Sequence, residues 1–410
     1  MEDLPIGRRV AYWRQRRKMS QQVFADRIGK SKSWVDKVER GVRQLDKFSV
    51  LYEIADVLRV DAQLMLGNDP KRRPENVNCI DQVEVEAIRD ALERYDQIGS
   101  LFAPMVAAPP ALDELCKAVR HAWMTFHHAK YGVLARTLPS LIRDAQAADA
   151  CYCSGADTRA GELLAQAYQI AASALRKLGE FDLCWLAADR AIAVSQRTND
   201  PLLAGVATFR VANALLALGR HRPAQNLNVT AASKIGRGGP EADTPERLSV
   251  YGILLLQGAM AAARGGDTPA VRELIDEAAC AADALGSDAN HYWTSFGPTN
   301  VLVHKAAAAV ELGDGHIAVQ THEQEMSVEA LAGLTPERRA NHFVDVARGY
   351  TQIGKLEEAG DMLLGADRLA PSEVRCRPMS HEVLTEVLRR SRTSPSGPLV
   401  ELADHMGVAV

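Results

Sequence analysis

Hydrophobic positions recur at helical spacing along most of this chain, and alanine supplies many of them. Small apolar side chains let helices approach closely, which favours helical packing over a sheet. The segment from Gly67 to Asn78 (GNDPKRRPENVN) interrupts the pattern with two prolines and a charge run, and it has no hydrophobic anchor. The pattern predicts an all-α protein with a small N-terminal unit, a linker and a long helical body.

Two short helices joined by a tight turn are predicted near the N-terminus. Ser20 is placed to cap the first helix, and Gly29 ends it as a residue able to take a positive φ. The apolar positions of the two helices are Val23, Phe24, Ile28, Trp34, Val35 and Val38. Ala25 is small where the helices must touch, and Gly41 closes the second helix. This spacing predicts a helix-turn-helix.

The segment resembles the lambdoid repressor and Cro family, the XRE-type regulators. The resemblance rests first on Gln21, Ala25, Gly29, Val35 and Val38. It continues into a fourth helix with Phe48, Leu51, Ile54, Ala55 and Leu58, and into a fifth after Val60 that is capped by Asp61. It therefore covers residues 1–67 and implies a five-helix, lambda-repressor-like DNA-binding domain.

The resemblance also implies which residues contact DNA. In this family the second motif helix enters the major groove and its outward side chains meet base edges. Gln21 matches a phosphate-binding position. The candidate DNA-binding residues are Gln21, Lys32, Ser33, Asp36, Lys37, Arg43 and Lys47. Arg14 and Glu39 match the positions of a partly buried ion pair, and Trp34 is expected to lie partly in the core. A homodimer on a two-fold operator of double-stranded DNA is the expected assembly.

The sequence of the helical body contains internal repeats. Leu178-Gly179, Leu218-Gly219, Arg264-Gly265, Leu312-Gly313 and Ile353-Gly354 each follow an alanine-rich helix. Five residues after each glycine stands a small residue, namely Cys184, Ala224, Ala270, Ala318 or Ala359. These features predict five helical hairpins between residues 158 and 371, each glycine ending the first helix of its hairpin. One or two degenerate helical pairs are expected before them, at residues 112–150.

The repeats resemble the tetratricopeptide repeat, and the last unit is the best match. Its residues Ala347, Tyr350, Gly354, Ala359, Ala366 and Pro371 fit the family's pattern. The longer periods of the earlier units leave a HEAT-like solenoid as the alternative. We divide the chain into the DNA-binding domain at 1–67, a linker at 68–78, degenerate pairs at 79–157, tetratricopeptide-like repeats at 158–390 and a C-terminal tail at 391–410.

Stacked hairpins of this type form a concave groove. The repeat register places polar residues on its wall, and asparagines there suit a peptide because an amide both donates and accepts hydrogen bonds. The candidate effector-binding residues are Gln166, Gln169, Asn213, Asn300, His304, Asn341, Asp345 and Arg348. The whole architecture is similar to peptide-pheromone sensors of Gram-positive bacteria, which implies a transcriptional regulator with a peptide effector. A small-molecule signal and a protein-docking scaffold remain alternatives.

Charge and cysteine content refine this interpretation. Residues 1–50 contain 13 Lys and Arg against six Asp and Glu; because the net charge of the chain is −4, the other residues carry −11. A basic N-terminal unit followed by an acidic helical body indicates that the N-terminal unit alone binds a polyanion. Seven scattered cysteines and the lack of a signal peptide or long apolar run predict a cytoplasmic location without membrane contact. No cofactor, metal site or catalytic constellation is predicted.

Overall fold

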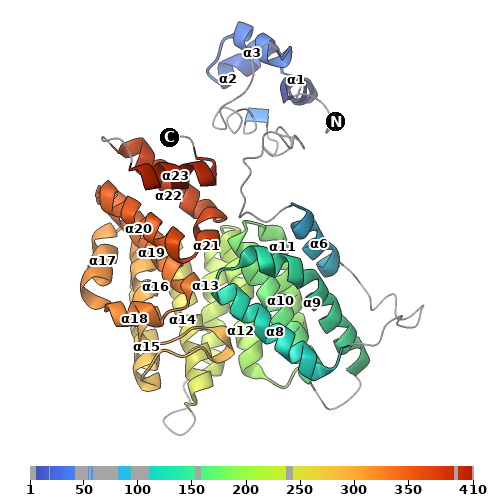
Figure 1. Cartoon of the computed structure of the whole chain (residues 1–410), viewed down its shortest axis with the longest axis vertical. Helices are drawn as coiled ribbons and strands as arrows, with labels where there is room; N and C mark the ends of the chain where they lie inside the picture. The colour runs from blue at the N-terminus through green and yellow to red at the C-terminus, as the bar shows by residue number, and fades with distance from the viewer. Residues whose placement is uncertain are drawn as a thin grey trace. The chain divides into compact units, whose positions relative to one another are not determined.

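The computed structural model describes residues 6–17, 19–41, 54, 57–58, 82–93, 110–152, 158–236, 243–391 and 396–408. The chain divides into two compact units, Met1–Glu75 and Asn76–Val410. The described residues are helical or lie in turns between helices (Figure 1). The predicted all-α class is confirmed.

The first unit contains α1 (Ile6–Arg16), α2 (Gln21–Arg27) and α3 (Lys32–Glu39). The hydroxyls of Ser20 and Ser31 accept hydrogen bonds from the N–H groups of Val23 and Trp34, and thus cap α2 and α3. The core consists of Val10, Phe24, Ala25, Ile28, Val35, Val38, Ile54 and Leu58. Val23, expected among the apolar contacts, is instead 44% exposed, because it lies on the outer face of α2.

The second unit contains a long succession of helices. They are α6 (Gln82–Glu93), α8 (Leu112–His127), α9 (Tyr131–Tyr152), α10 (Arg159–Lys177), α11 (Phe181–Ser195), α12 (Pro201–Ala217), α13 (His221–Ile235), α14 (Pro245–Arg264), α15 (Thr268–Leu285), α16 (Pro298–Glu311), α17 (Gly315–Gln320), α18 (Val328–Gly333), α19 (Pro336–Gln352), α20 (Leu356–Leu369), α21 (Pro371–Arg375), α22 (Pro378–Arg390) and α23 (Gly397–Met406). A 3-10 turn at His291–Trp293 and a π turn at Thr321–Glu325 complete them.

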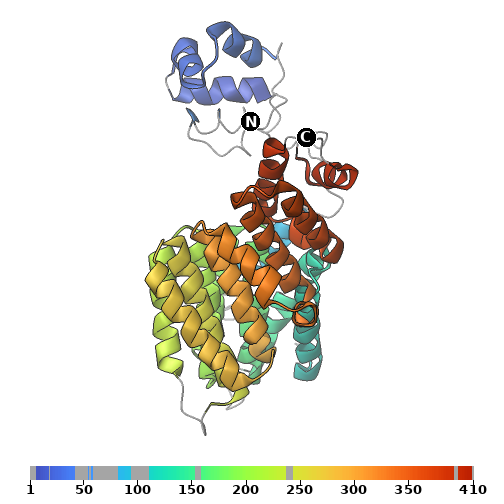
Figure 2. The ribbon, with the colours of Figure 1, turned by 90° about the vertical axis from the view of Figure 1, so that its left-hand side faces the viewer.

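Five of the helix pairs are the predicted hairpins: α10/α11, α12/α13, α14/α15, α16/α17 and α19/α20. At each turn a glycine takes a positive φ between 74° and 83°. The following residue donates its N–H to the carbonyl five positions earlier, as Arg220 does to Leu215. Figure 2 shows hairpins lying side by side. The predicted tetratricopeptide-like solenoid is confirmed.

In the α14/α15 hairpin the predicted glycine is wrong by one residue. Gly265 has a φ of −82°, and Gly266, with a φ of +74°, is the left-handed residue. The residue five positions on is therefore Val271, which is 7% exposed, whereas Ala270 is only partly buried. The Arg-Gly-Gly sequence allowed either register, and the hydrogen bond from Asp267 to Ala262 selects the second.

The first helix of each hairpin lies on the inside, and these inner helices form a closed ring. Contacts run from α8 to α10, α12, α14, α16 and α19, and α19 packs back against α8. Figure 1 shows the C-terminal helices returning to the side of α10 and α11. The concave side of the solenoid is therefore enclosed, because the solenoid turns far enough for its two ends to meet.

The turn glycines predict a stability effect. At Gly219, with a φ of +74°, a Cβ would have nothing within 4 Å, so the cost of Gly219→Ala is backbone strain alone. We expect a loss of about 1 kcal/mol in the free energy of unfolding, measured by urea denaturation. Gly333, helical and equally open, is the matched control. Gly333→Ala is expected to stabilise by about 0.5 kcal/mol, so equal signs for the two variants would contradict this interpretation.

Candidate functional site

Glu39 organises the first unit. Its carboxylate accepts hydrogen bonds from Arg14 Nε at 2.5 Å and Nη2 at 2.9 Å, and both side chains are buried. Arg14 Nη1 also donates to the carbonyl of Met19 at 2.7 Å. Gln21 Nε2 donates to Glu39 Oε2 at 2.8 Å, so the expected phosphate contact competes with an internal one. The network ties α1 and the start of α2 to the end of α3.

The side chains expected to read DNA lie on the outer surface of α3. Lys32, Ser33 and Lys37 are exposed, and Asp36 forms an ion pair of 2.5 Å with Arg40. Trp34 is partly buried, as the sequence suggested. Arg43 and Lys47 lie outside the described residues. An exposed row of this kind leaves its donors free for an external partner.

The second candidate site is a cavity of about 350 Å³ inside the ring of inner helices. All six inner helices contribute to its wall, and residues of the 3-10 turn and of α22 complete it. One register position recurs. Arg210, Gln257, His304 and Asp345 each stand nine residues before the left-handed glycine of their hairpin, and all four line the cavity.

The predicted effector-binding residues divide into two groups. Those that line the cavity are Asn213, His304, Asn341 and Asp345. Gln166 accepts a hydrogen bond from Trp293 Nε1 at 3.2 Å instead. Gln169 and Asn300 are buried at 1% and 0% exposure, away from the wall, and Arg348 pairs with Glu311 at 2.9 Å. The residues of the second group do not line the cavity.

His304 is neutral and hydrogen-bonded at both ring nitrogens. Burial lowers its pKa to about 3. Its Nδ1 lies 2.9 Å from the carbonyl of Asn300 and its Nε2 lies 2.9 Å from Gln257 Nε2. Because the carbonyl can only accept, Nδ1 carries the proton and Nε2 accepts from the amide. The oxygen of Gln257 remains as an acceptor for a ligand.

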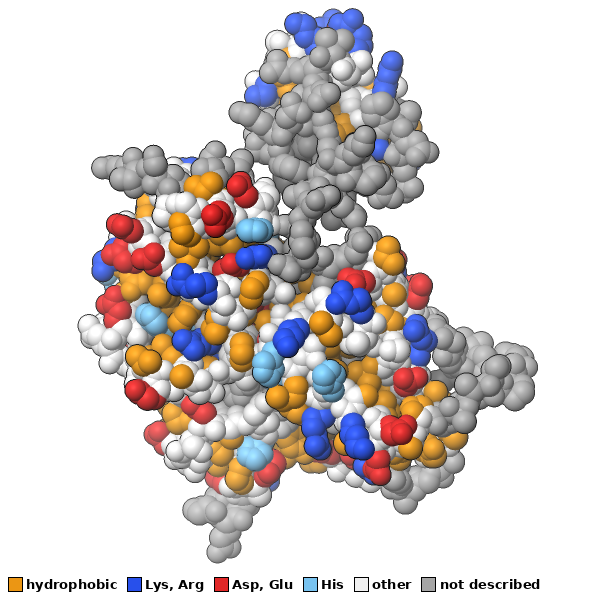
Figure 3. Space-filling model, viewed as in Figure 1, with side chains coloured by type: hydrophobic (Ala, Val, Ile, Leu, Met, Phe, Trp, Pro, Cys, Tyr) orange, Lys and Arg blue, Asp and Glu red, His pale blue; other side chains and the backbone are white. Residues whose placement is uncertain are grey.

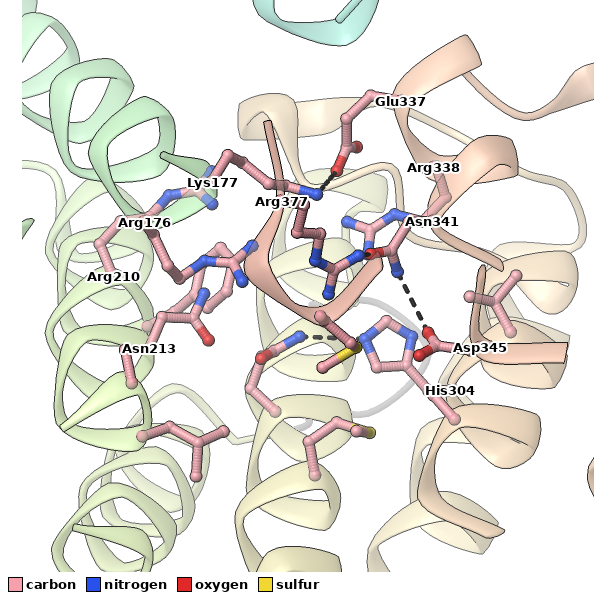
Figure 4. Close-up of a pocket in the computed structure, with 18 of the residues that line it drawn as sticks. Arg176, Lys177, Arg210, Asn213, His304, Glu337, Arg338, Asn341, Asp345 and Arg377 are labelled. Atoms are coloured by element: carbon pink, nitrogen blue, oxygen red, sulfur yellow. Dashed lines mark hydrogen bonds and ion pairs between the residues drawn. The ribbon is translucent and has the colours of Figure 1, made fainter. Parts of the chain in front are cut away.

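Sequence reasoning missed the basic residues of the cavity. Its wall includes six Lys and Arg side chains against four Asp and Glu. The basic side chains are Arg176, Lys177, Arg210, Arg264, Arg338 and Arg377. Figure 4 shows Arg210 and Asn213 on one side, Arg338, Asn341 and Asp345 on the other, and Arg377 between them. The recurring position before the turn glycine could have identified Arg210, since it is the equivalent of His304.

A buried ion-pair network lies at one end of this wall. Lys177 Nζ lies 2.5 Å from Glu337 Oε1 and 2.6 Å from Glu373 Oε1, and all three side chains are at most 4% exposed. Tyr131 donates its hydroxyl proton to Glu373 Oε2, and Arg377 Nη1 lies 3.2 Å from Glu373 Oε1. The network joins α9 and α10 to α19 and α21, and it closes the ring.

A group of aromatic rings adjoins this network, where Phe126 of α8 lies 5.8 Å from Tyr131 between ring centroids. Trp123 and Trp293 stack at 5.7 Å between ring centroids, and His127 stacks beside them. Burial lowers the pKa of His127 to about 4, so this ring is neutral at pH 7. Trp293 has a φ of +59° in the loop between α15 and α16. Phe296 anchors this loop, packed so closely on Gly252 that a Cβ there would lie 1.9 Å from the ring.

Other site types find little support in the part of the chain that the structure describes. There, no group of three His, Cys, Asp or Glu side chains could hold a metal ion. No helix within those residues has the length and apolar character needed to cross a membrane. Figure 3 shows charges of both signs interspersed over this face of the helical unit. This face is not the uniformly basic surface that typically binds DNA.

Comparisons with known proteins locate one family. Residues 5–66 match the family described as a helix-turn-helix domain, which confirms the predicted motif. No curated protein sequence matches the chain significantly.

Among solved structures, the chain is similar to a Rap protein complexed with competence and sporulation factor, at 12% identity and a TM-score of 0.47, over 91% of this chain and 99% of that one. It is also similar to aspartyl phosphate phosphatase F from Bacillus subtilis, at 11% identity and a TM-score of 0.43, over 89% and 93%. A third is PlcR from Bacillus thuringiensis in complex with the peptide PapR7 and DNA, at 12% identity and a TM-score of 0.28, over 89% and 98%.

Proposed function

We propose that this chain is a sequence-specific DNA-binding transcriptional regulator whose helical unit binds a short peptide effector in the central cavity. The observation that carries the proposal is the cavity itself, which lies where all six inner helices meet. A ligand held there contacts every hairpin that bounds the ring. Binding that favours one arrangement of these helices can shift the equilibrium between two states of the regulator.

The polar groups of the cavity suit a peptide. Asn213, Gln257 and Asn341 reach the wall from α12, α14 and α19. The amide of Asn213 can pair with both the N–H and the carbonyl groups of a main chain, and Gln257 offers its oxygen. The amide of Asn341 donates to Asp345 and accepts from Arg377, so a ligand would compete with these internal contacts. A volume of about 350 Å³ holds only part of a peptide, so we propose that the effector enters by one end.

A small-molecule effector is the second candidate, and the closed ring favours it. The 350 Å³ cavity falls at the lower end of the range of about 300–1,000 Å³ found for small-ligand sites. Protease treatment of an active cell-extract fraction separates the two candidates, because it destroys a peptide and leaves a metabolite intact.

We further propose that the regulator is a homodimer on a two-fold operator with half-sites about one helical turn apart, because one small head offers a limited interface. Light scattering of the full chain, free and on DNA, tests this assembly.

Loss of Lys37 is expected to weaken operator binding. Lys37 is exposed on α3, where its ammonium group can donate to a guanine edge. Lys37→Ala should cost about 1–3 kcal/mol on the cognate site and relax the sequence preference, measured by fluorescence anisotropy on operator and scrambled duplexes. Lys234, exposed on the helical unit, supplies the control variant Lys234→Ala. Unchanged affinity for both duplexes in Lys37→Ala and Lys32→Ala would show that α3 does not read DNA.

Loss of Asn213 is expected to abolish the response to the effector. Asn213 lines the cavity, and an amide lost from a ligand contact costs about 1–3 kcal/mol. We expect Asn213→Ala to bind operator as wild type does, yet to remain bound when the active low-molecular-weight fraction of a cell extract is added. Asn226→Ala, on the exposed face of α13, should respond normally. A normal response from Asn213→Ala would place the sensor elsewhere.

A further inference from the structure

The cations of the cavity fall into two classes. Lys177 pairs with Glu337 and Glu373, Arg377 pairs with Glu373, and Arg264 lies 3.7 Å from Glu311. By contrast, no described carboxylate lies within ion-pair distance of the other three guanidinium groups, those of Arg176, Arg210 and Arg338. The Nε atoms of Arg210 and Arg338 are buried and have no hydrogen-bond partner among the described residues.

Aromatic rings hold Arg210 in place without neutralising it. Its guanidinium carbon lies 4.1 Å from the ring centroid of Phe209 and 5.3 Å from that of Trp123, and the residue is only 8% exposed. Stacking uses the face of the planar guanidinium and leaves its N–H edge free for a bidentate acceptor. Burial, followed by the neighbouring charges of Arg176 and Arg338, lowers the pKa of Arg210 to about 9. The nearby Glu337 acts in the opposite direction but forms no ion pair with Arg210, so the group is protonated at pH 7 without a direct acceptor among the described residues.

An uncompensated buried charge is costly, and proteins normally pair it. Here the acceptor is missing from the described residues, while the donors converge on a cavity with room for one. Arg176 and Arg210 approach from α10 and α12, and Arg338 approaches from α19 (Figure 4). Two sides of the ring thus present cations to the same space.

We infer that Arg176, Arg210 and Arg338 form an oxyanion-binding subsite that takes a carboxylate or phosphate group of the effector. The inference rests on the proposed function and deepens it, because it assigns the chemistry of the group that enters the cavity. For a peptide this group is the C-terminal carboxylate or an acidic side chain; for a small molecule it is an acid or a phosphate ester. The oxyanion supplies the acceptor that the Arg210 side chain lacks.

The test uses the full chain and two simple probes, inorganic phosphate and succinate, in thermal denaturation at constant ionic strength with chloride as the reference ion. We expect either probe to raise the melting temperature of wild type by about 3 °C near ten times its dissociation constant. Arg210→Met, which keeps the contact with Phe209 and Trp123, should lose most of this shift and melt at a higher temperature than wild type without any probe. Arg338→Gln should also lose most of the shift.

Arg272→Gln is the matched control, since Arg272 is exposed on α15 and does not line the cavity. The difference between wild type and Arg210→Met also separates the cavity from the basic helix-turn-helix unit. A larger shift with succinate identifies a carboxylate source, and a larger shift with phosphate identifies a phosphate source. Equal shifts in wild type, Arg210→Met and Arg338→Gln would overturn the subsite. The proposed function fails by a different result, namely no effect of any extract fraction on operator binding.

Discussion

Replacement of Lys177 by methionine is expected to destabilise the helical unit by about 3–5 kcal/mol at pH 7. The substitution removes the cation that lies 2.5 Å from Glu337 and 2.6 Å from Glu373, and both carboxylates stay buried. Breaking a buried ion pair costs this much because the remaining charge loses its compensation. Urea denaturation followed by circular dichroism measures the loss, and Lys234→Met, at an exposed position, should change stability by less than about 0.5 kcal/mol.

The pH dependence of this variant gives an independent check. In wild type, burial acts to raise the pKa of Glu337, but the nearby Lys177 and Arg338 outweigh it and hold the pKa well below its ordinary value. Without Lys177 that pKa should rise above its unfolded value, so the carboxyl group takes up a proton in the folded state as the pH falls. The stability gap between wild type and variant should therefore narrow toward acid pH. A gap that stays constant between pH 7 and pH 5 would contradict the ion-pair explanation.

Acidification from pH 7 to pH 5 is expected to cost the helical unit about 6 kcal/mol of stability, close to the whole stability of many domains. Burial lowers the pKa of His127 to about 4 and the pKa values of His304 and His342 to about 3. Their folded pKa values lie below the unfolded value of about 6.5, so the unfolded state binds more protons throughout this window. Each histidine then contributes a slope that approaches about 1.4 kcal/mol per pH unit once the pH falls below about 6.5, where its unfolded form is mostly protonated.

Carboxylates do not cause this loss, because the contribution of Glu337 persists until the pH falls below its unfolded pKa of about 4.5. His304→Gln should reduce the slope between pH 6 and pH 5 by about 1.4 kcal/mol per pH unit, whatever its effect at pH 7. His316→Gln, exposed on α17, should leave the slope unchanged. The measurement is a series of urea denaturations at stepped pH, and identical slopes for wild type and His304→Gln would rule out the buried ring as the source.

The fold was predictable where a backbone requirement left a mark on the sequence. Turn glycines located the five hairpins, because a left-handed residue is needed at each turn. The preceding α8/α9 pair lacks the turn glycine that marks the other hairpins, because Ala129 occupies the equivalent position with a φ of 53°. Its turn closes with the same hydrogen bond, from Lys130 to the carbonyl of Thr125, so a hairpin was present without its usual residue.

The site was predictable only in part, because ring closure depends on small rotations summed over six hairpins. Asn213 and His304 were identified from their position on the inner helices, whereas Arg377 reaches the cavity only because the C-terminal helices return to α10. Asn300 was misplaced because a polar residue on an inner helix can also face its neighbour. Its amide is fully buried, and neither polar atom has a hydrogen-bond partner within the described residues.

Closure of the ring changes how this protein must fold during its synthesis. Repeat arrays are usually quasi-one-dimensional, so early units gain stability as soon as their neighbours emerge. Here Tyr131 and Lys177 are separated from Glu373 by 242 and 196 residues along the chain. Joining ends that far apart costs about 5 kcal/mol of chain entropy before the contacts form. Helices α8 to α16 therefore emerge from the ribosome as a partial array, in which Lys177 has no carboxylate partner from α19 or α21. The last hundred residues supply these partners and complete the interior of the ring.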